Sequence, residues 1–250
     1  MSDVPDIYDE PDLYDEQYLR YRDDIPFYQR LAVDVGEPVL ELGAGSGRLS
    51  VELGRAGHRV VGVELSPRML EQGRARVEAE RLDERVRLLA GDMRKLRLEE
   101  RFPLIVAAFN TLMHLYTPAD QDAALATVAT LLAPGGTFAF DLFLPEFGPQ
   151  GLLRREAEWE NVGGARSELF LVQEHDRVAQ TITSRYYLDS SGADGLLRRR
   201  TTTLHQRYYT RFEIERALRQ AGFSRISLSG DFDRRPVTAD SPRLVGLARL

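Results

Sequence analysis

The sequence contains no cysteine, a single lysine and only four histidines, which stand far apart. The lack of cysteine excludes disulfides, thiolate catalysis and cysteine-based zinc sites, and the dispersed histidines match no metal-binding motif. No apolar run approaches the roughly 20 residues that cross a bilayer, and the first residues are acidic instead of forming a basic region followed by an apolar one. We therefore expect a cytoplasmic protein without a metal centre and without a membrane segment.

A broad basic surface is also missing. The net charge is −6, from 33 basic and 39 acidic residues, and residues 1–24 alone hold nine acids against two arginines. Nucleic-acid phosphates demand clustered lysine and arginine, so the sequence does not favour a nucleic-acid partner. The length of 250 residues and the ordinary apolar content suit one α/β domain, or one domain with an insertion.

Strand-like and helix-like segments alternate through the first 142 residues. Apolar periodicity and turn residues predict strands over residues 39–42, 59–63, 86–90, 104–109 and 137–142. They predict helices over residues 24–35, 46–56, 66–80 and 119–132. Strands that alternate with helices indicate a parallel, doubly wound sheet.

The pattern changes between about residues 145 and 209. Three β-type runs, at residues 169–174, 179–188 and 196–207, are separated by turn-prone stretches at 176–177 and 190–195. A helix over residues 211–221 and strands over 223–229 and 243–250 then complete the chain. We expect a Rossmann-like α/β sheet of seven strands, the last antiparallel, with an antiparallel β insertion after the fifth strand.

The residues with the clearest chemistry lie where the first strand ends. Gly43, Gly45 and Gly47 alternate between that strand and the next helix, and without side chains they let the backbone approach a ligand closely. Glu64 follows nineteen residues after Gly45, at the end of the second strand, where its carboxylate can accept both hydroxyls of a ribose. A dinucleotide site uses the same features, so these residues alone do not choose the cofactor.

Further segments resemble the motifs of the class I S-adenosylmethionine (SAM)-dependent methyltransferases. Four of them occur in the order of that family: Glu41-Leu-Gly-Ala-Gly-Ser-Gly47, Val63-Glu-Leu-Ser-Pro-Arg-Met-Leu70, Gly91-Asp-Met93 and Leu132-Ala-Pro-Gly-Gly-Thr137. Arg48 stands where a dinucleotide turn would need glycine. The resemblance implies a methyltransferase that uses SAM as cofactor and releases S-adenosylhomocysteine.

The resemblance also implies a role for each matching residue. Glu41 and the backbone of Gly43, Ala44, Gly45 and Gly47 would face the methionine part of SAM. Glu64 would hold the ribose and Asp92 the adenine amine, while Leu65 and Met93 would sandwich the adenine ring. The alternatives are a solvated turn carboxylate for Asp92 and ordinary core packing for Leu65 and Met93.

Phe109, Asn110 and His114 follow the fourth strand, where the family places residues beside the transferring methyl group. The loop lacks the Asn-Pro-Pro-Tyr sequence, which argues against methylation of a planar amide or of an adenine amine. His114 could be a general base for a hydroxyl acceptor or a helix-start residue packed against the sheet, and both interpretations stay open. We interpret His205, within a β-type run, as structural.

The acidic leader is rich in tyrosine. Tyr14, Tyr18 and Arg22 resemble the leader of small-molecule methyltransferases, in which tyrosine closes the site and arginine can pair with the SAM carboxylate. A disordered acidic tail is the alternative.

The layout as a whole is similar to that of the bacterial aminosugar N,N-dimethyltransferases. It implies an N-terminal lid or helical segment at residues 1–35, a SAM-binding core at 36–144 and 209–250, and an insertion at 145–208 that covers the acceptor site. Tyr186, Tyr187 and Arg200 are candidate acceptor contacts within the insertion, although a role on the sheet surface is favoured for them.

These features predict methyl transfer to a small-molecule acceptor, with an amine nitrogen favoured, by in-line displacement. The alternative is an O-methyltransferase with His114 as base. A Rossmann-type NAD-dependent oxidoreductase and a non-catalytic SAM-binding protein are less favoured. The sequence leaves open whether the chain forms a homodimer.

Overall fold

The computed structural model describes residues 4–160, 166–191 and 195–250 of the chain. The chain divides into a larger unit, Leu19–Pro145 with Tyr208–Leu250, and a smaller unit, Met1–Tyr18 with Glu146–Arg207. The leader therefore divides between the two units at Tyr18. The predicted turn at residues 190–195 includes residues 192–194, which lie outside the described residues.

The larger unit is built on a mixed sheet, which has seven strands in the described part of the chain, in the order β10-β11-β5-β4-β1-β2-β3. The strands are β1 (Val39–Leu42), β2 (Val60–Glu64), β3 (Val86–Ala90), β4 (Phe102–Ala107), β5 (Leu132–Phe143), β10 (Arg225–Ser229) and β11 (Arg243–Arg249). β11 runs antiparallel to both of its neighbours, β5 and β10, while β1 pairs in parallel with β2 and β4. The Rossmann-like fold with an antiparallel last strand is confirmed.

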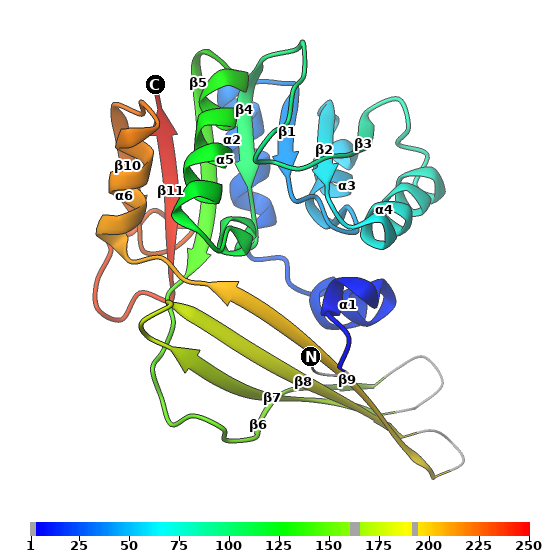
Figure 1. Ribbon diagram of the computed structural model, residues 1–250. Helices are drawn as coiled ribbons and strands as arrows, with labels where there is room; N and C mark the ends of the chain where they lie inside the picture. Colours follow the sequence, from blue (N-terminus) through cyan, green and yellow to red (C-terminus); the bar gives the residue numbers. More distant parts are fainter. Residues whose placement is uncertain (1–3, 161–165, 192–194) are drawn as a thin grey trace. The chain divides into compact units, whose positions relative to one another are not determined.

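Helices cover both faces of this sheet, because its central strands are apolar on both sides. The helices are α2 (Ile25–Val35), α3 (Arg48–Arg55), α4 (Pro67–Ala79), α5 (Pro118–Leu131), α6 (Arg211–Gln220) and a short 3-10 helix (Thr111–His114). In Figure 1, α5 lies in front of the sheet and α2 behind it. Every residue of β1 is buried. In the described part of the chain, no helix combines the length and the apolar character needed to cross a membrane.

Side chains set where these helices begin. Ser66 accepts a hydrogen bond from the backbone N–H of Met69 and is followed by Pro67, which suits the first helical position. Thr210 and Glu213 form a reciprocal capping box at the start of α6. These local signals explain why the observed bounds of the core helices lie within two residues of the predicted ones.

The start of β5 differs from the prediction. The sequence predicts a helix to residue 132 and a strand from residue 137, but β5 begins at Leu132, which pairs with Phe102 of β4. The pairing is irregular between Phe102 and Leu104, and Gly135 adopts a left-handed φ of +75°. The Pro-Gly-Gly sequence therefore lies in a bulge within β5, between Leu132 and Thr137, which both pair with β4.

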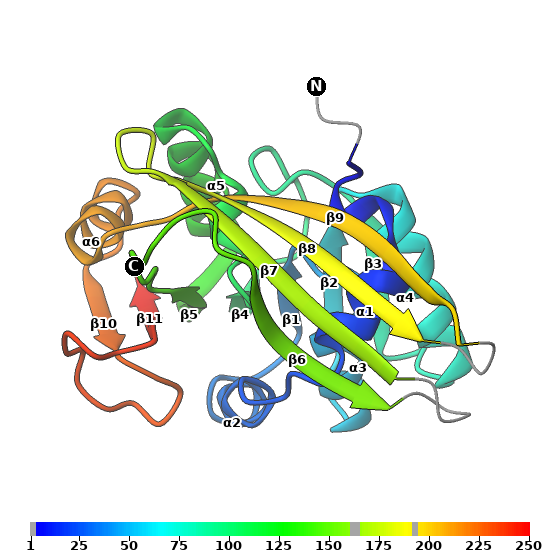
Figure 2. The same ribbon diagram turned by 90° about the horizontal axis from the view of Figure 1, so that it is seen from below.

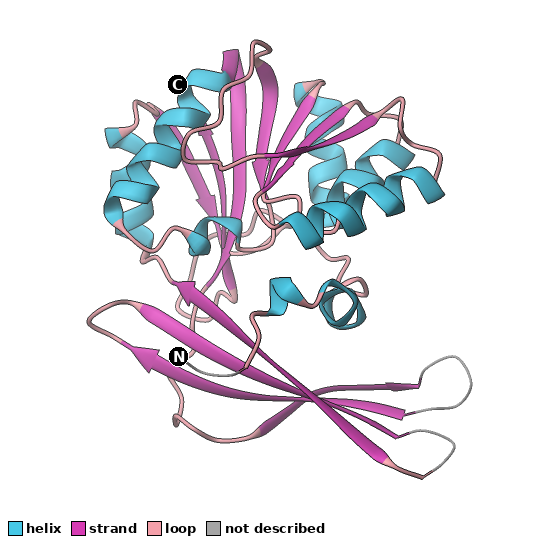
Figure 3. Ribbon diagram, turned by 45° about the vertical axis from the view of Figure 1, so that its right-hand side comes forward, coloured by secondary structure: helices cyan, strands magenta, loops and turns pink. Residues whose placement is uncertain are grey.

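The smaller unit contains an antiparallel sheet, whose strands in the described residues follow the order β6-β7-β8-β9 (Figure 2). These strands are β6 (Arg154–Glu160), β7 (Arg166–Asp176), β8 (Thr181–Ser191) and β9 (Leu197–Arg207). They twist along their length, as Figure 3 shows. The sequence does not predict β6, because this edge strand is almost entirely exposed and carries charged residues instead of an apolar alternation.

Part of the leader is ordered on this second sheet. A 3-10 helix (Ile7–Asp9) and α1 (Pro11–Tyr18) form there, and Leu13 of α1 packs against Leu169 and Leu188. The backbone N–H of Thr203 in β9 donates to the carbonyl of Pro5 at 3.0 Å. Residues 4–18 therefore do not behave as the solvated tail that was the alternative to a lid.

Candidate active site

The glycine turn follows β1 at the point where the sheet changes its winding direction. β1 neighbours β4, but the chain continues from β1 to β2 and β3 on one side and from β4 to β5 on the other. In open α/β sheets, ligands bind in the crevice at the carboxyl ends of the strands beside such a switch point. Among the predicted site residues, Glu64 ends β2, and Phe109 and Asn110 follow β4.

Gly43, Gly45 and Gly47 all adopt left-handed backbone conformations, with φ of +65°, +58° and +79°. Residues with a side chain rarely adopt such angles, which explains the alternating glycines. A Cβ atom on Gly43 would also lie 2.7 Å from Cγ2 of Thr111, in the turn after β4. The glycine turn and the turn after β4 are therefore in direct contact.

Two further contacts hold the glycine turn in place. The backbone N–H of Ala44 donates to the carbonyl of Val63 at 3.0 Å, which ties the turn to β2. Arg76 of α4 donates to the carbonyl of Ser46 at 2.6 Å and approaches the Ser46 hydroxyl at 3.1 Å. Sequence reasoning missed Arg76, since nothing local links it to a residue thirty positions away.

Glu64 lies at the end of β2 with both carboxylate oxygens turned to backbone N–H groups. Gly45 donates to Oε2 at 2.8 Å and Ser66 donates to Oε1 at 2.7 Å. Each carboxylate oxygen can accept more than one hydrogen bond, so both retain capacity for a ligand hydroxyl. Burial raises the pKa of Glu64, although these N–H donors oppose the shift. Next to it, Leu65 is an apolar residue that is 65% exposed.

Asp92 forms an ion pair in the structure. Arg94, two residues further on, approaches Oδ2 of Asp92 at 2.7 Å and also donates to Oδ1 of Asp120 at 2.6 Å. The Arg94 hydrogen bond lowers the pKa of Asp92 and keeps this carboxylate ionised. An adenine amine would thus share Asp92 with Arg94. Met93, between the two, is half-buried.

Glu41, the acid before the glycines, is buried in β1. The hydroxyl of Ser50 in α3 donates to its carboxylate, and burial raises the pKa of Glu41 to about 7. This side chain can therefore change its ionisation near neutral pH. Ser50 was not among the predicted site residues.

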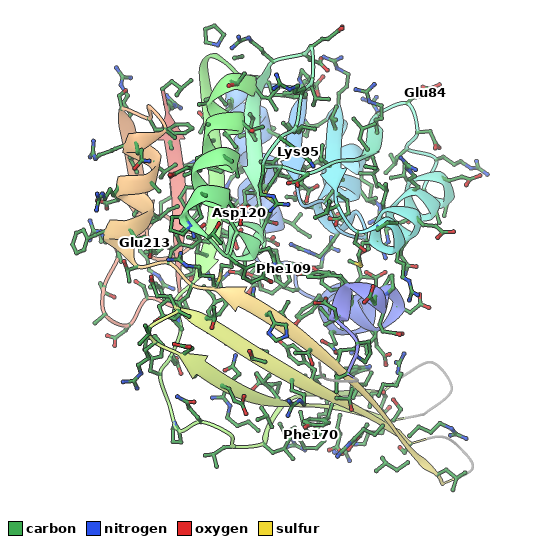
Figure 4. The ribbon with its side chains drawn as sticks, viewed as in Figure 1. Glu84, Lys95, Phe109, Asp120, Phe170 and Glu213 are labelled. Atoms are coloured by element: carbon green, nitrogen blue, oxygen red, sulfur yellow. The ribbon has the colours of Figure 1, made fainter. Side chains whose placement is uncertain are left out.

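The turn after β4 has an unusual backbone. Phe109 and Asn110 both adopt positive φ angles, 53° and 66°, although neither is glycine. The N–H of Phe109 donates to Oδ1 of Asp141 at 2.8 Å, and the N–H of Phe143 donates to Oδ1 of Asn110 at 2.6 Å. Figure 4 labels Phe109 just beyond the end of β4. Sequence reasoning placed Phe109 and Asn110 in the site but missed Asp141.

The side chain of Arg48 contacts three neighbouring segments of the larger unit. Its guanidinium, which is buried, donates to both carboxylate oxygens of Asp24, at 2.8 Å and 2.5 Å, and to the carbonyl of Tyr21 at 3.1 Å. It also lies 4.8 Å from the centre of the Phe109 ring and 5.5 Å from that of Tyr21. Arg48 therefore links α3, the start of α2 and the turn after β4.

His114 ends the short 3-10 helix that follows this turn. Burial lowers its pKa to about 4, so the imidazole is neutral at pH 7. Among the described residues, no group of three or more histidine, aspartate or glutamate side chains is arranged to hold a metal ion.

The predicted leader residues fall in different units. Tyr14 and Tyr18 belong to the smaller unit, where their ring centres lie 4.9 Å apart and the Tyr18 ring meets Tyr186 edge-on at 6.4 Å. Burial raises the pKa of Tyr18 and of Tyr186, so both stay protonated. Arg22 belongs to the larger unit and pairs with Glu52 at 2.8 Å.

The remaining candidates of the insertion contact residues of the smaller unit. Arg200 forms an ion pair with Glu16 of α1, and Arg199 lies 5.1 Å from the centre of the Tyr187 ring. His205 contacts the hydroxyl of Thr183 at 3.1 Å through Nδ1.

Comparison with known proteins identifies the family. The family model described as "Methyltransferase domain" matches residues 39–136. Cypemycin N-terminal methyltransferase from Streptomyces sp. is 30% identical over 222 residues, which cover 84% of this chain and 82% of that protein. The dTDP-3-amino-3,4,6-trideoxy-alpha-D-glucopyranose N,N-dimethyltransferase of Streptomyces venezuelae is 31% identical over 54% of each chain.

A solved structure extends the likeness over nearly the whole chain. SAM-bound CalS10, an amino pentose methyltransferase from Micromonospora echinaspora, superposes with a TM-score of 0.75 and 24% identity, covering 95% of this chain and 97% of that one. At this identity the superposition establishes a shared fold. Together with the glycine turn, its paired Glu64 and the nearly full-length relative, it shows that the chain belongs to the class I SAM-dependent methyltransferases and uses SAM as its cofactor.

Proposed function

We propose that this methyltransferase transfers the methyl group of SAM to an amine nitrogen of a small molecule. The observation that carries the proposal is the lowered pKa of His114, the candidate base beside the turn after β4. With its pKa lowered to about 4, this imidazole is a weak proton acceptor at neutral pH. Efficient general bases have a pKa near the operating pH, so an acceptor that needs no base suits this site better.

The relatives support the same choice. The names of two of them refer to N-terminal methylation and to N,N-dimethylation of an amino sugar, and the superposed structure is an amino pentose methyltransferase. A neutral amine presents its lone pair directly, whereas a hydroxyl must lose a proton as it attacks. These names favour nitrogen as the acceptor atom without identifying the acceptor molecule.

The residues of the larger unit fit SAM. The left-handed glycines leave room for a close ligand, Glu64 offers lone pairs on both oxygens, and Leu65 presents an exposed apolar surface to a ring. We assign the methionine part to Glu41 and the glycine turn, the ribose to Glu64, and the adenine to Leu65, Asp92 and Met93. Bound SAM supplies an electrophilic methyl group.

The protein's part in the reaction is then mainly alignment and exclusion of water. The amine attacks the methyl carbon as the carbon–sulfur bond breaks, and the proton on the product nitrogen leaves to solvent. Within the larger unit, the turn at Phe109 and Asn110 is held from β5 and from Arg48, so it can offer a fixed wall to the reacting atoms.

A screen of acceptors tests the proposal. Purified protein is incubated with SAM and matched pairs of amines and alcohols on the same scaffold, and release of S-adenosylhomocysteine is measured together with the mass of the product. We expect turnover with amines and mono- or dimethylated products. Turnover with the alcohol of a pair but not with its amine would contradict the proposal and favour an O-methyltransferase.

A further inference from the structure

Asp141, near the end of β5, is a buried carboxylate with two hydrogen-bond donors on one oxygen. It is 4% exposed, and its Oδ1 accepts from the hydroxyl of Tyr28 at 2.6 Å and from the backbone N–H of Phe109 at 2.8 Å. Tyr28 belongs to α2 and is fully buried. The carboxylate thus joins a helix on one face of the sheet to the turn after β4.

The turn that receives this contact has a backbone that needs external support. Two consecutive residues with side chains, Phe109 and Asn110, have φ of 53° and 66°. Such conformations persist where the surrounding structure determines them, and they concentrate at functional sites. Two of the hydrogen bonds that hold the turn are made with β5. The Phe109 N–H donates to Asp141, and the Phe143 N–H donates to the Asn110 side chain.

A small movement of this turn would reach the glycine turn directly. Thr111 lies so close to Gly43 that no Cβ atom fits between them. The Phe109 ring also packs against the Arg48 guanidinium at 4.8 Å and the Tyr21 ring at 5.1 Å. Because interiors are close-packed, loss of the anchor at the Phe109 N–H would shift these neighbours as well.

We propose that Asp141 is a positioning residue for methyl transfer: through Oδ1 it fixes the left-handed Phe109–Asn110 turn against the glycine turn. This inference rests on the proposed placement of the reaction beside that turn. It holds for an amine or a hydroxyl acceptor alike, because it concerns the geometry of the Phe109–Asn110 turn and involves no proton transfer.

A purely structural role would consist of satisfying the buried Tyr28 hydroxyl. The test therefore starts from Tyr28→Phe, which removes that hydroxyl and leaves the bond from Asp141 to the Phe109 N–H intact. Tyr28→Phe/Asp141→Ala removes the carboxylate, and with it the acceptor of the Phe109 N–H, without leaving an unpaired tyrosine hydroxyl in the core. Phe138→Leu, at a buried residue in the middle of β5 whose ring packs against Phe140 and Phe223, serves as a control for a general loss of stability.

We expect kcat of the Tyr28→Phe/Asp141→Ala protein to fall roughly 10–100-fold below that of Tyr28→Phe, the size of effect that small misplacements produce. The KM for SAM should change much less. Tyr28→Phe/Asp141→Asn should recover part of kcat, since its amide oxygen can still accept. Phe138→Leu should keep kcat close to that of the wild type.

Hydrogen exchange of the peptide containing residues 108–111 provides a readout that needs no acceptor. The Phe109 amide should exchange faster in the Asp141→Ala double variant than in Tyr28→Phe. If the Asp141→Ala double variant does not fold, Tyr28→Phe/Asp141→Asn is measured instead. Its Phe109 amide should also exchange faster than that of Tyr28→Phe. Exchange equal to that of Tyr28→Phe would overturn the proposal. An Asn variant as inactive as the Ala variant would also overturn it, because the charge would then be the essential property.

Discussion

Gly45 donates its backbone N–H to Oε2 of Glu64 at 2.8 Å, so the glycine turn and the acid at the end of β2 are joined directly. This hydrogen bond orients the Glu64 carboxylate toward the turn. Loss of Glu64 would release one N–H of the turn and, in the proposed site, would also remove the acceptor of the ribose hydroxyls.

We therefore expect Glu64→Ala to weaken SAM binding by about 1–3 kcal/mol, because the ribose hydroxyls lose a charged acceptor. The SAM affinity of Glu64→Gln should lie between those of the wild type and Glu64→Ala, since the glutamine amide keeps one acceptor oxygen. Titration calorimetry with SAM and S-adenosylhomocysteine measures both. Binding of SAM to the Ala variant at wild-type affinity would show that Glu64 is not the ribose ligand.

Replacement of His114 by alanine separates the two kinds of acceptor. With an amine, His114→Ala should leave kcat nearly unchanged. With a hydroxyl acceptor that depends on this base, kcat should fall by about 10²–10⁴-fold. Since burial lowers the pKa of His114 to about 4, we expect no activity step from this residue between pH 5 and 8. A large loss of kcat with an amine, at unchanged SAM affinity, would refute the assignment.

Glu41 should make stability depend on pH. Burial raises its pKa from 4.5 to about 7, so the folded protein binds a proton more tightly than the unfolded chain does. The stabilisation from this group is fully present below pH 4.5 and is lost as pH rises through about 7. Denaturant unfolding of wild type and Glu41→Gln should show a smaller decrease between pH 5 and 8 in the variant. Identical slopes would mean that Glu41 titrates normally.

Removal of one partner of the Arg48–Asp24 ion pair should cost more stability than removal of one partner of a surface pair, because both side chains are buried. Arg48→Met leaves the Asp24 carboxylate without its partner, and breaking a buried pair in this way costs about 3–5 kcal/mol. The double variant Arg48→Met/Asp24→Leu should recover much of the loss. Urea unfolding measures these differences, and a single variant as stable as the wild type would contradict the expectation.

The lid role of the leader remains a prediction. Deletion of residues 1–22 should leave a folded core, weaken SAM binding and lower turnover, since an aromatic lid excludes water. The deletion also removes the Tyr21 carbonyl that accepts from Arg48, so Tyr14→Phe/Tyr18→Phe is needed as a milder companion variant. Unchanged kinetics in the truncated protein would mean that the leader has no part in the reaction.

The sequence predicts those parts of the fold that depend on neighbouring residues. The apolar run of β1, the glycines after it and the Ser-Pro start of α4 each have a local cause, and the structure has them within two residues of the prediction. β6 was missed because a charged edge strand carries no apolar period.

Sequence reasoning located candidate site residues where a motif determines their position in the fold, and it missed contacts made by residues far away along the chain. Glu64 stands in a motif, so its place was predicted from spacing alone. Asp141 and Arg76 reach the two turns from β5 and α4, thirty or more positions away along the chain. No local pattern shows such a contact. Arg48 was noticed only as a missing glycine, because its partner Asp24 precedes it by 24 positions.

The same exposed edge strand that escaped prediction affects how the molecules behave in concentrated solution. Along β6 and β7, Arg155 and Arg166 both pair with Glu158 and Glu168. An edge strand offers unpaired backbone groups to any neighbouring chain, and a row of charges discourages that approach. Salt screens exposed charges, with a Debye length near 3 Å at 1 M. If a second chain pairs along β6, we expect high salt to favour that pairing and dilute buffer to oppose it.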